Sequence, residues 1–238
     1  MSDNLTLKSS KNDSLTNTQL VKIAATRINH KLHFRLFKRV IDISISLFFI
    51  ALQLPVILII SIFIKIDSPG PILIKQKRIG RNRRKYKRNN KSDERRKVNL
   101  QGQPFVMYKF RSMVDSSNLY DVKPLSVTDE RITRVGRFLR RSSLDELPQL
   151  INVLKGDMSL VGPRPELEFI VQKYDAYQSL RLEVKPGITG IWQLQGSRKK
   201  HIHEDVHLDL EYIQNQSIRT DFTILLKTLK FALFLRNF

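Results

Sequence analysis

The sequence predicts a helix-dominated α+β protein: an N-terminal re-entrant membrane helix, a small cytosolic domain with short strands, and amphipathic helices at the C-terminus. Three observations support this class. A run of 22 residues without a charge, Ile43–Ile64, is long enough for a membrane helix. Few segments show the alternation of strands, and most later segments show helical spacing. With 238 residues, the chain can form one compact domain with appendages.

The N-terminal part divides into a polar tail at 1–30, which we expect to be disordered, and a membrane-inserted helix at 31–66, followed by the cytosolic domain at 67–238. Pro55 lies near the middle of the uncharged run, and Lys and Arg flank both of its ends. Because basic residues mark the cytoplasmic side of a membrane, these features favour a re-entrant helix over a spanning one. A buried core helix of a soluble domain is the remaining alternative.

The chain is strongly basic, with 42 Lys and Arg against 22 Asp and Glu, a formal net charge of +20. Thirteen of these basic residues lie between Lys75 and Lys97, and most of this block falls in the segment 81–100. A solvated loop beside a membrane helix suits anionic phospholipid as its counter-surface. Nucleic acid is the alternative, but Tyr86 is the single aromatic residue of the block, so we expect no nucleic-acid partner.

The cytosolic domain contains several predicted elements. They are a strand at Phe105–Phe110, a basic helix near Ile132–Arg141, helices near Glu146–Leu154 and Glu166–Leu182, a turn at Pro186–Gly190, and a final pair of helices in which Thr220–Leu235 is amphipathic and interfacial.

Asp145 lies at the start of an apolar-periodic helix. A helix start offers free backbone N–H groups and a positive dipole end, which suit phosphate, and a carboxylate beside them could attack phosphorus. The alternative is structural, because Ser143 and Glu146 match a capping box, or Asp145 is itself the N-cap. The two adjacent acids, Asp145 and Glu146, would also need a metal ion or a cationic partner.

Basic residues in two other segments suit phosphate. Arg164 stands between two prolines, which would hold its guanidinium rigidly for paired hydrogen bonds, although a structural turn explains the same pattern. Lys109 and Arg111 lie two residues apart on the predicted strand and would therefore share a face.

His203-Glu204-Asp205-Val206-His207 matches the H-E-x-x-H zinc pattern of metallopeptidases. A catalytic zinc needs a third protein ligand, and no histidine follows His207. A solvated helix face is the simpler interpretation of this charged stretch. The chain has no cysteine, which excludes disulfides and thiolate metal sites.

Taken together, the segments resemble the bacterial sugar transferase family, the monotopic polyprenol-phosphate phosphoglycosyl transferases that initiate lipid-linked glycan assembly. The matching segments occur in order along almost the whole chain after the tail. They are Lys38–Asp42, Asp67–Pro71, Gln76–Gly80, Tyr108–Met113, Arg141–Leu150, Leu154–Pro165, Lys185–Gly190 and Leu208-Asp209.

The resemblance implies a ping-pong reaction in which Asp145 attacks a UDP-sugar, expels UMP and carries the phosphosugar to undecaprenyl phosphate. It implies Mg²⁺ at Asp145, with Glu146 nearby as a second catalytic acid. It also implies a location on the cytoplasmic face of the bacterial inner membrane. The predicted substrate-binding residues are Arg164, Lys109, Arg111 and Arg141. Neither the sugar nor the oligomeric state is predicted, and a homodimer remains open.

The sequence also departs from the family pattern. Leu54 stands before the proline where many members have serine, segment 81–100 looks like an insertion, and Gln195-Gly-Ser-Arg198 replaces the usual Asn-Gly-Arg. A substrate contact for Arg198 is therefore not predicted.

Overall fold

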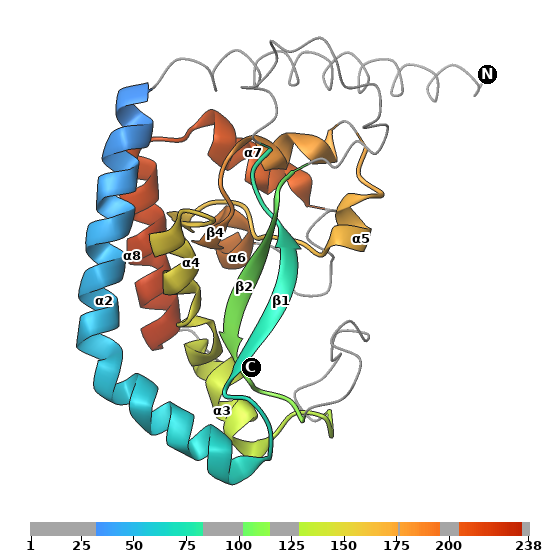
Figure 1. Cartoon of the computed structure of the whole chain (residues 1–238). Helices are drawn as coiled ribbons and strands as arrows, with labels where there is room; N and C mark the ends of the chain where they lie inside the picture. The colour runs from blue at the N-terminus through green and yellow to red at the C-terminus, as the bar shows by residue number, and fades with distance from the viewer. Residues whose placement is uncertain (1–31, 83–101, 115–128, 176, 196–204, 235–238) are drawn as a thin grey trace, which may run out of the picture.

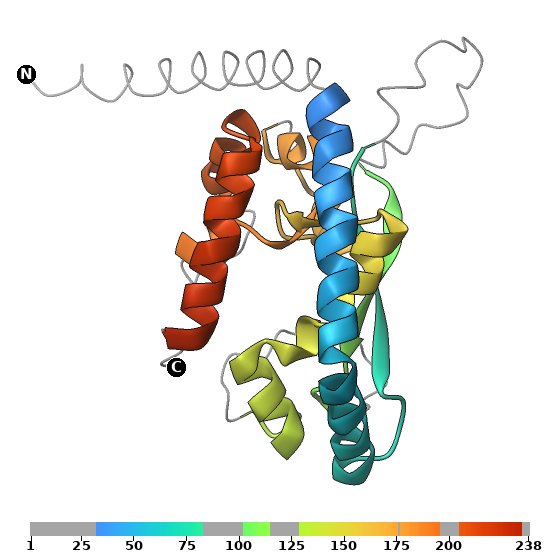
Figure 2. The same ribbon diagram turned by 90° about the vertical axis from the view of Figure 1, so that its left-hand side faces the viewer.

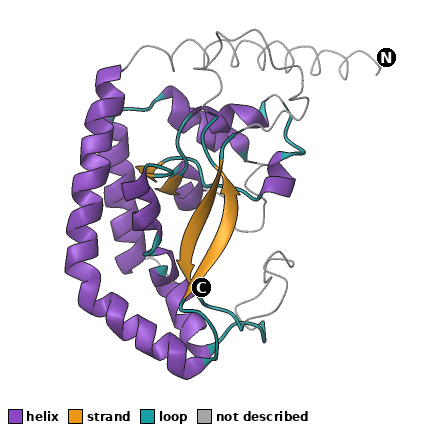
Figure 3. Ribbon diagram, in the orientation of Figure 1, coloured by secondary structure: helices purple, strands orange, loops and turns teal. Residues whose placement is uncertain are grey.

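The computed structural model describes residues 32–82, 102–114, 129–175, 177–195 and 205–234. Figure 3 shows mostly helices with two small two-stranded sheets, which confirms the helix-dominated α+β class. The elements, with η for 3-10 helices, are α2 (Leu32–Asp67), β1 (Leu73–Ile79), β2 (Pro104–Phe110), α3 (Arg134–Ser142), η2 (Leu144–Glu146), α4 (Gln149–Lys155), β3 (Ser159–Val161), α5 (Glu168–Val171), η3 (Gln178–Glu183), β4 (Gly187–Thr189), α6 (Ile191–Gln195), α7 (Val206–Gln214) and α8 (Ile218–Phe234). The tail at 1–30 lies outside the described residues, as does segment 81–100 beyond Arg81 and Asn82, on which the nucleic-acid alternative depends.

The long helix α2 contains 36 residues and continues through Pro55. Figure 1 shows that it bends part-way along its length, and an internal proline is an ordinary cause of such a bend. By length and composition the helix could cross a membrane: its most apolar window has a mean hydropathy of 2.8, and 11% of that window is buried. The core helix of a soluble domain would be mostly buried, so the exposure of α2 disfavours that alternative.

Polar side chains near the start of α2 attach it to the domain. The carboxylate of Asp42 is buried and accepts hydrogen bonds from the hydroxyl of Ser159 at 3.1 Å and the N–H of Leu160 at 3.0 Å, both on β3. Arg39 donates to two carbonyl groups near the end of α4, at 2.5 and 2.7 Å. A cation at a helix C-terminus also interacts favourably with the helix dipole. The segment Lys38–Asp42 is therefore a structural joint.

Lys38 extends this joint to α8. Its ammonium group donates to Asp221 at 2.5 Å and to the carbonyl of Val161 at 3.2 Å. The hydroxyl of Tyr212, on α7, donates to the second oxygen of Asp221 at 2.8 Å. Figures 1 and 2 show α8 running beside the first half of α2, and Figure 2 shows α3 and α8 on the same side of α2.

The two sheets join segments that are distant in sequence. β1 and β2 pair antiparallel from Leu73–Phe110 to Ile79–Pro104, so the predicted strand at 105–110 is confirmed. β3 and β4 pair in parallel, and they approach closely because of glycines: a Cβ on Gly187 would lie 2.1 Å from the nitrogen of Gly162. These contacts fix the turn that follows β3 against the turn that precedes β4.

The helix predicted at 166–182 is wrong, because the structure has only α5 and η3 in this region. The backbone of Glu166 pairs with Ile79 instead, with an N–H to carbonyl distance of 3.0 Å. The side chain of Asp175 accepts the N–H of Gln178 at 2.7 Å, a local bond that competes with helix formation.

The helix predicted at 146–154 is divided at Pro148 into η2 and α4. The basic helix predicted at 132–141 is present as α3, and a helix occupies the predicted C-terminal position as α8.

Lys38→Met should lower the melting temperature, because it leaves the buried Asp221 carboxylate without its cation, a change that typically costs about 3–5 kcal/mol. The double variant Lys38→Met/Asp221→Asn should recover part of this loss, since the amide is neutral and can still accept from Tyr212. Thermal unfolding in detergent micelles measures both. Equal stability of Lys38→Met and the wild type would contradict the assigned role.

Candidate active site

The two adjacent acids lie on η2, a single 3-10 turn between α3 and α4. The turn begins after Ser143, whose backbone is left-handed (φ 52°), an uncommon conformation for a residue with a side chain. Ser143 makes no side-chain capping bond, and the N-cap of α4 is Pro148, so neither capping interpretation of Asp145 applies. The acids therefore project from a sharp corner between helices.

Apolar neighbours fix this corner on the second half of α2. Leu144 and Leu147 flank the acids and pack, partly buried, in a cluster with Ile60 and Ile64 of α2. The two leucines pack into this apolar cluster, whereas Glu146, between them, contacts Lys109 and Arg164. The position of η2 is thereby tied to the apolar helix.

Glu146 is held by two cations from separate elements. Its Oε1 accepts from Nζ of Lys109 on β2 at 3.2 Å and from the Arg164 guanidinium at 2.7 Å. Burial alone would raise the pKa of Glu146, but the charges of Arg164 and Lys109 hold that pKa well below its ordinary value. Glu146 is therefore ionised, and the structure brings these three predicted site residues into contact.

The Asp145 carboxylate makes no hydrogen bond or ion pair with any part of the chain that the structure describes. Burial raises the pKa of Asp145, and the charge of Glu146 adds to the rise, against the opposing charges of Lys109, Arg164 and Arg140. Within the described residues, the site thus has one carboxylate fixed by ion pairs, Glu146, beside one carboxylate without a partner, Asp145. The second is available for a substrate or a cation.

The turn that carries Arg164 is fixed through its backbone. The carbonyl of Pro163 accepts from the N–H of Gly187 at 2.9 Å, and that of Pro165 accepts from Arg78 at 3.3 Å. The carbonyl of Glu166 pairs with β1, as described above. A rigid turn lets the Arg164 guanidinium bind with little loss of conformational entropy.

β2 and α4 are joined by the amide of Asn152, which holds Lys109 beside η2. Its Nδ2 donates to the carbonyl of Val106 at 2.6 Å, and its Oδ1 accepts from the N–H of Tyr108 at 3.0 Å. Asn152 therefore bonds the edge of β2 as a neighbouring strand would. Sequence reasoning missed this residue, because its role depends on a non-local contact.

Arg111 contacts the end of α2, whereas Lys109 contacts Glu146. It lies just beyond the end of β2, is 2% exposed, and donates to the carbonyl groups of Ile64 at 3.1 Å and Ser68 at 2.5 Å. These bonds tie the end of α2 to β2. The placement gives no support to the predicted role of Arg111 as a substrate contact.

The geometry favours Arg140, rather than the predicted Arg141, as the arginine of α3 that acts on the site. Arg141 is exposed, on the same side of α3 as Phe138, whereas Arg140 is partly buried and its charge acts on Asp145. Arg140 donates to the hydroxyl of Ser112 at 2.9 Å. The signal in the sequence is helical spacing, because Arg140 is one turn after the buried Gly136.

A metal ion held entirely by protein ligands does not fit the described residues, which contain no group of three or more His, Asp or Glu side chains placed to bind one. His203 and Glu204 of the zinc pattern lie outside the described residues, as does Arg198. His207 and Asp209 lie on α7, where Asp209 is buried.

Known proteins match this chain along most of its length. The family model described as bacterial sugar transferase matches residues 33–90 and 93–235. Over 213 residues, the chain is 40% identical to the undecaprenyl-phosphate glucose phosphotransferase of Komagataeibacter xylinus, covering 84% of this chain and 36% of that protein.

Two other relatives have similar sequence identity to this chain. The UDP-glucose:undecaprenyl-phosphate glucose-1-phosphate transferase of Caulobacter vibrioides is 37% identical over 203 residues, 80% of this chain and 67% of that protein. The undecaprenyl-phosphate galactose phosphotransferase of Salmonella typhimurium is 37% identical over 215 residues, 84% of this chain and 41% of that protein. The chain thus spans about two-fifths or less of the length of two of these relatives.

Glu146→Gln should lower the pKa of Asp145, because it removes the adjacent negative charge and releases Lys109 and Arg164 to interact with Asp145. Carboxyl ¹³C chemical shifts followed through a pH titration measure this pKa. Glu168→Gln, at the start of α5, is the matched control and should leave the titration of Asp145 unchanged. A higher pKa of Asp145 in Glu146→Gln would contradict the electrostatic arrangement.

Proposed function

The chain belongs to the bacterial sugar transferase family, and from this premise we propose that it transfers a phosphosugar from a UDP-sugar to undecaprenyl phosphate and releases UMP. The names of the relatives in Caulobacter and Salmonella support the acceptor and the class of donor. One observation carries the proposal: Asp145 is a carboxylate without a hydrogen-bond or ion-pair partner among the described residues, and it lies beside three cations and the ion-paired Glu146. A nucleophile for phosphorus needs this kind of surrounding.

In the first half-reaction, an Asp145 oxygen attacks the phosphorus that bears the sugar. A bond forms between the carboxylate oxygen and phosphorus, and the bond from that phosphorus to the bridging oxygen breaks, so UMP leaves with the electron pair. Arg164 and Lys109, already placed beside Asp145, would stabilise the negative charge on the phosphate oxygens. The product is an aspartyl phosphosugar on the enzyme.

In the second half-reaction, a phosphate oxygen of undecaprenyl phosphate attacks the same phosphorus and the Asp145 carboxylate leaves. The lipid product is a diphosphate-linked sugar, and the enzyme is regenerated. Both steps use one site in turn, which gives ping-pong kinetics. Glu146 stays ionised and keeps the two cations beside the reacting group.

Mg²⁺ fits this site in a limited way. It commonly binds one or two carboxylates together with substrate phosphates and waters, so a full set of protein ligands is not required. Asp145, whose charge is unfavourably buried and which has no partner in the part of the chain that the structure describes, would be its protein ligand. When bound, the ion would neutralise part of the diphosphate charge.

The attachment of η2 to α2 supports a reaction at the membrane surface. We infer that α2 enters the membrane, bends near Pro55 and returns to the same face, and that the domain lies on the cytoplasmic side of the inner membrane. The exposed apolar side chains along α2 support insertion. Anionic phospholipid is the expected surface for the basic residues of the chain.

Asp145→Asn should reduce UMP release by about a thousandfold or more, because an amide is a poor nucleophile for phosphorus. The assay would supply undecaprenyl phosphate and Mg²⁺, with UDP-glucose and UDP-galactose in parallel because both sugars occur in the names of relatives. Asp157→Asn, an acid after the end of α4, is the matched control and should keep wild-type activity.

Trapping the intermediate tests the order of the steps. With UDP-sugar and no lipid acceptor, the wild type should release one equivalent of UMP per enzyme and stop, and it should gain the mass of a phosphosugar. Asp145→Asn should release no UMP and gain no mass. Full activity of Asp145→Asn would refute the assignment of the nucleophile.

A further inference from the structure

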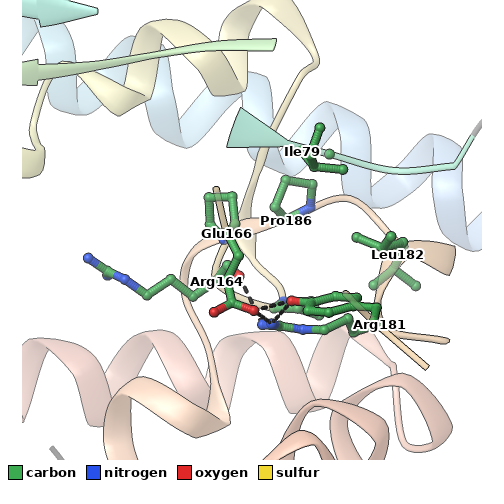
Figure 4. A pocket seen from close by; sticks show the side chains of 11 residues that line it. Ile79, Arg164, Glu166, Arg181, Leu182 and Pro186 are labelled. Atoms are coloured by element: carbon green, nitrogen blue, oxygen red, sulfur yellow. Dashed lines mark hydrogen bonds and ion pairs between the residues drawn. The ribbon is translucent and has the colours of Figure 1, made fainter. Parts of the chain in front are cut away.

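Arg181, on η3, is a buried cation at the centre of a polar cluster behind the Arg164 turn. It is 2% exposed. One of its terminal nitrogens donates to Glu166 and to the hydroxyl of Tyr174, each at 2.6 Å. The other donates to the backbone carbonyl of Arg164 at 2.9 Å and forms an ion pair with Asp209 at 2.6 Å. Figure 4 shows Arg181 and Glu166 together in the pocket behind the turn.

The bond to the Arg164 carbonyl links this cluster to the candidate active site. In Figure 4 the side chain of Arg164 extends away from Glu166 and Arg181. Its guanidinium reaches Glu146 at 2.7 Å. Arg181 therefore binds the backbone of Arg164, while the Arg164 side chain extends to Glu146 in the candidate active site. The bond from Arg181 to this carbonyl therefore also restrains the direction in which the Arg164 side chain leaves the turn.

Stability alone is a poor explanation for the cluster. Arg181 lies between two acids, so the buried group carries an excess negative charge when all three are ionised. Burial raises the pKa of Asp209 to about 6, although the charge of Arg181 opposes the rise. Buried ion pairs are often no more stabilising than apolar residues of similar volume. The geometric role of Arg181 is therefore the stronger explanation.

We propose that Arg181 is a positioning residue for Arg164: with Glu166 and Asp209 as its counter-ions, it fixes the turn so that the Arg164 guanidinium points at Glu146 and the phosphate site. The effect on turnover rests on the proposed transferase function, whereas the effect on the turn itself does not. Lysine could not replace Arg181, because its single ammonium group cannot extend two separate donors to opposite sides.

A double-mutant cycle tests whether Arg181 acts through Arg164. We expect Arg181→Lys to lower kcat/KM for UMP release about tenfold in the wild-type background and no more than about twofold in the Arg164→Ala background. Residues that act through one another show such non-additivity. An equal loss in both backgrounds would overturn the proposal, because it would mean that Arg181 supports the fold in general.

Hydrogen–deuterium exchange supplies a measurement that does not depend on activity. Arg181→Lys should speed the exchange of backbone amides in residues 160–168 of the full-length protein, while the control Arg39→Lys, which changes an arginine bonded to α4, should not. Unchanged exchange in Arg181→Lys would overturn the proposal. A wild type that releases no UMP from any UDP-sugar would refute the transferase function, and the exchange result would still decide whether Arg181 holds the turn.

Discussion

Lys38 and Arg39 donate hydrogen bonds, and Asp42 accepts them, to join the N-terminal part of α2 to α8, α4 and β3. These groups are buried or partly buried, so the helix could not slide or rotate against the domain without leaving poorly hydrated charges unpaired, which is costly. Leu144 and Leu147 then pack on the second half of the same helix. The distance between the acidic corner and the apolar helix is thus fixed by the fold, and the site inherits its position from this joint.

Asp145 and Glu146 are neighbours in sequence, but their different surroundings suit them to different roles. Glu146 has two cationic partners and remains charged, whereas Asp145 has burial and a like charge beside it. A nucleophile that was already in a strong ion pair would have to give up that pair before reacting. Placing the ion pairs on Glu146 keeps Lys109 and Arg164 within reach of the reaction without engaging Asp145 itself.

Local patterns in the sequence predict those elements whose interactions are local, such as α2, α3, β2 and α8. They fail for β1, β3 and β4, because pairing of these strands depends on distant segments and on closely packed glycines. The site shows the same division. Glu146, Lys109 and Arg164 are predicted and meet in the structure, whereas the choice between Arg140 and Arg141 depends on which face of α3 is buried.

The two attachments of α2, at Asp42 near its start and through Arg111 to the carbonyl of Ile64 near its end, bracket the whole uncharged run. One inserted or deleted residue between them would turn the rest of the helix by about 100° and carry Ile60 and Ile64 from the domain side to the exposed side. Replacement of one apolar side chain by another on the exposed face changes neither attachment. In evolutionary terms, this helix can vary widely in composition while its length between the two attachments stays constrained.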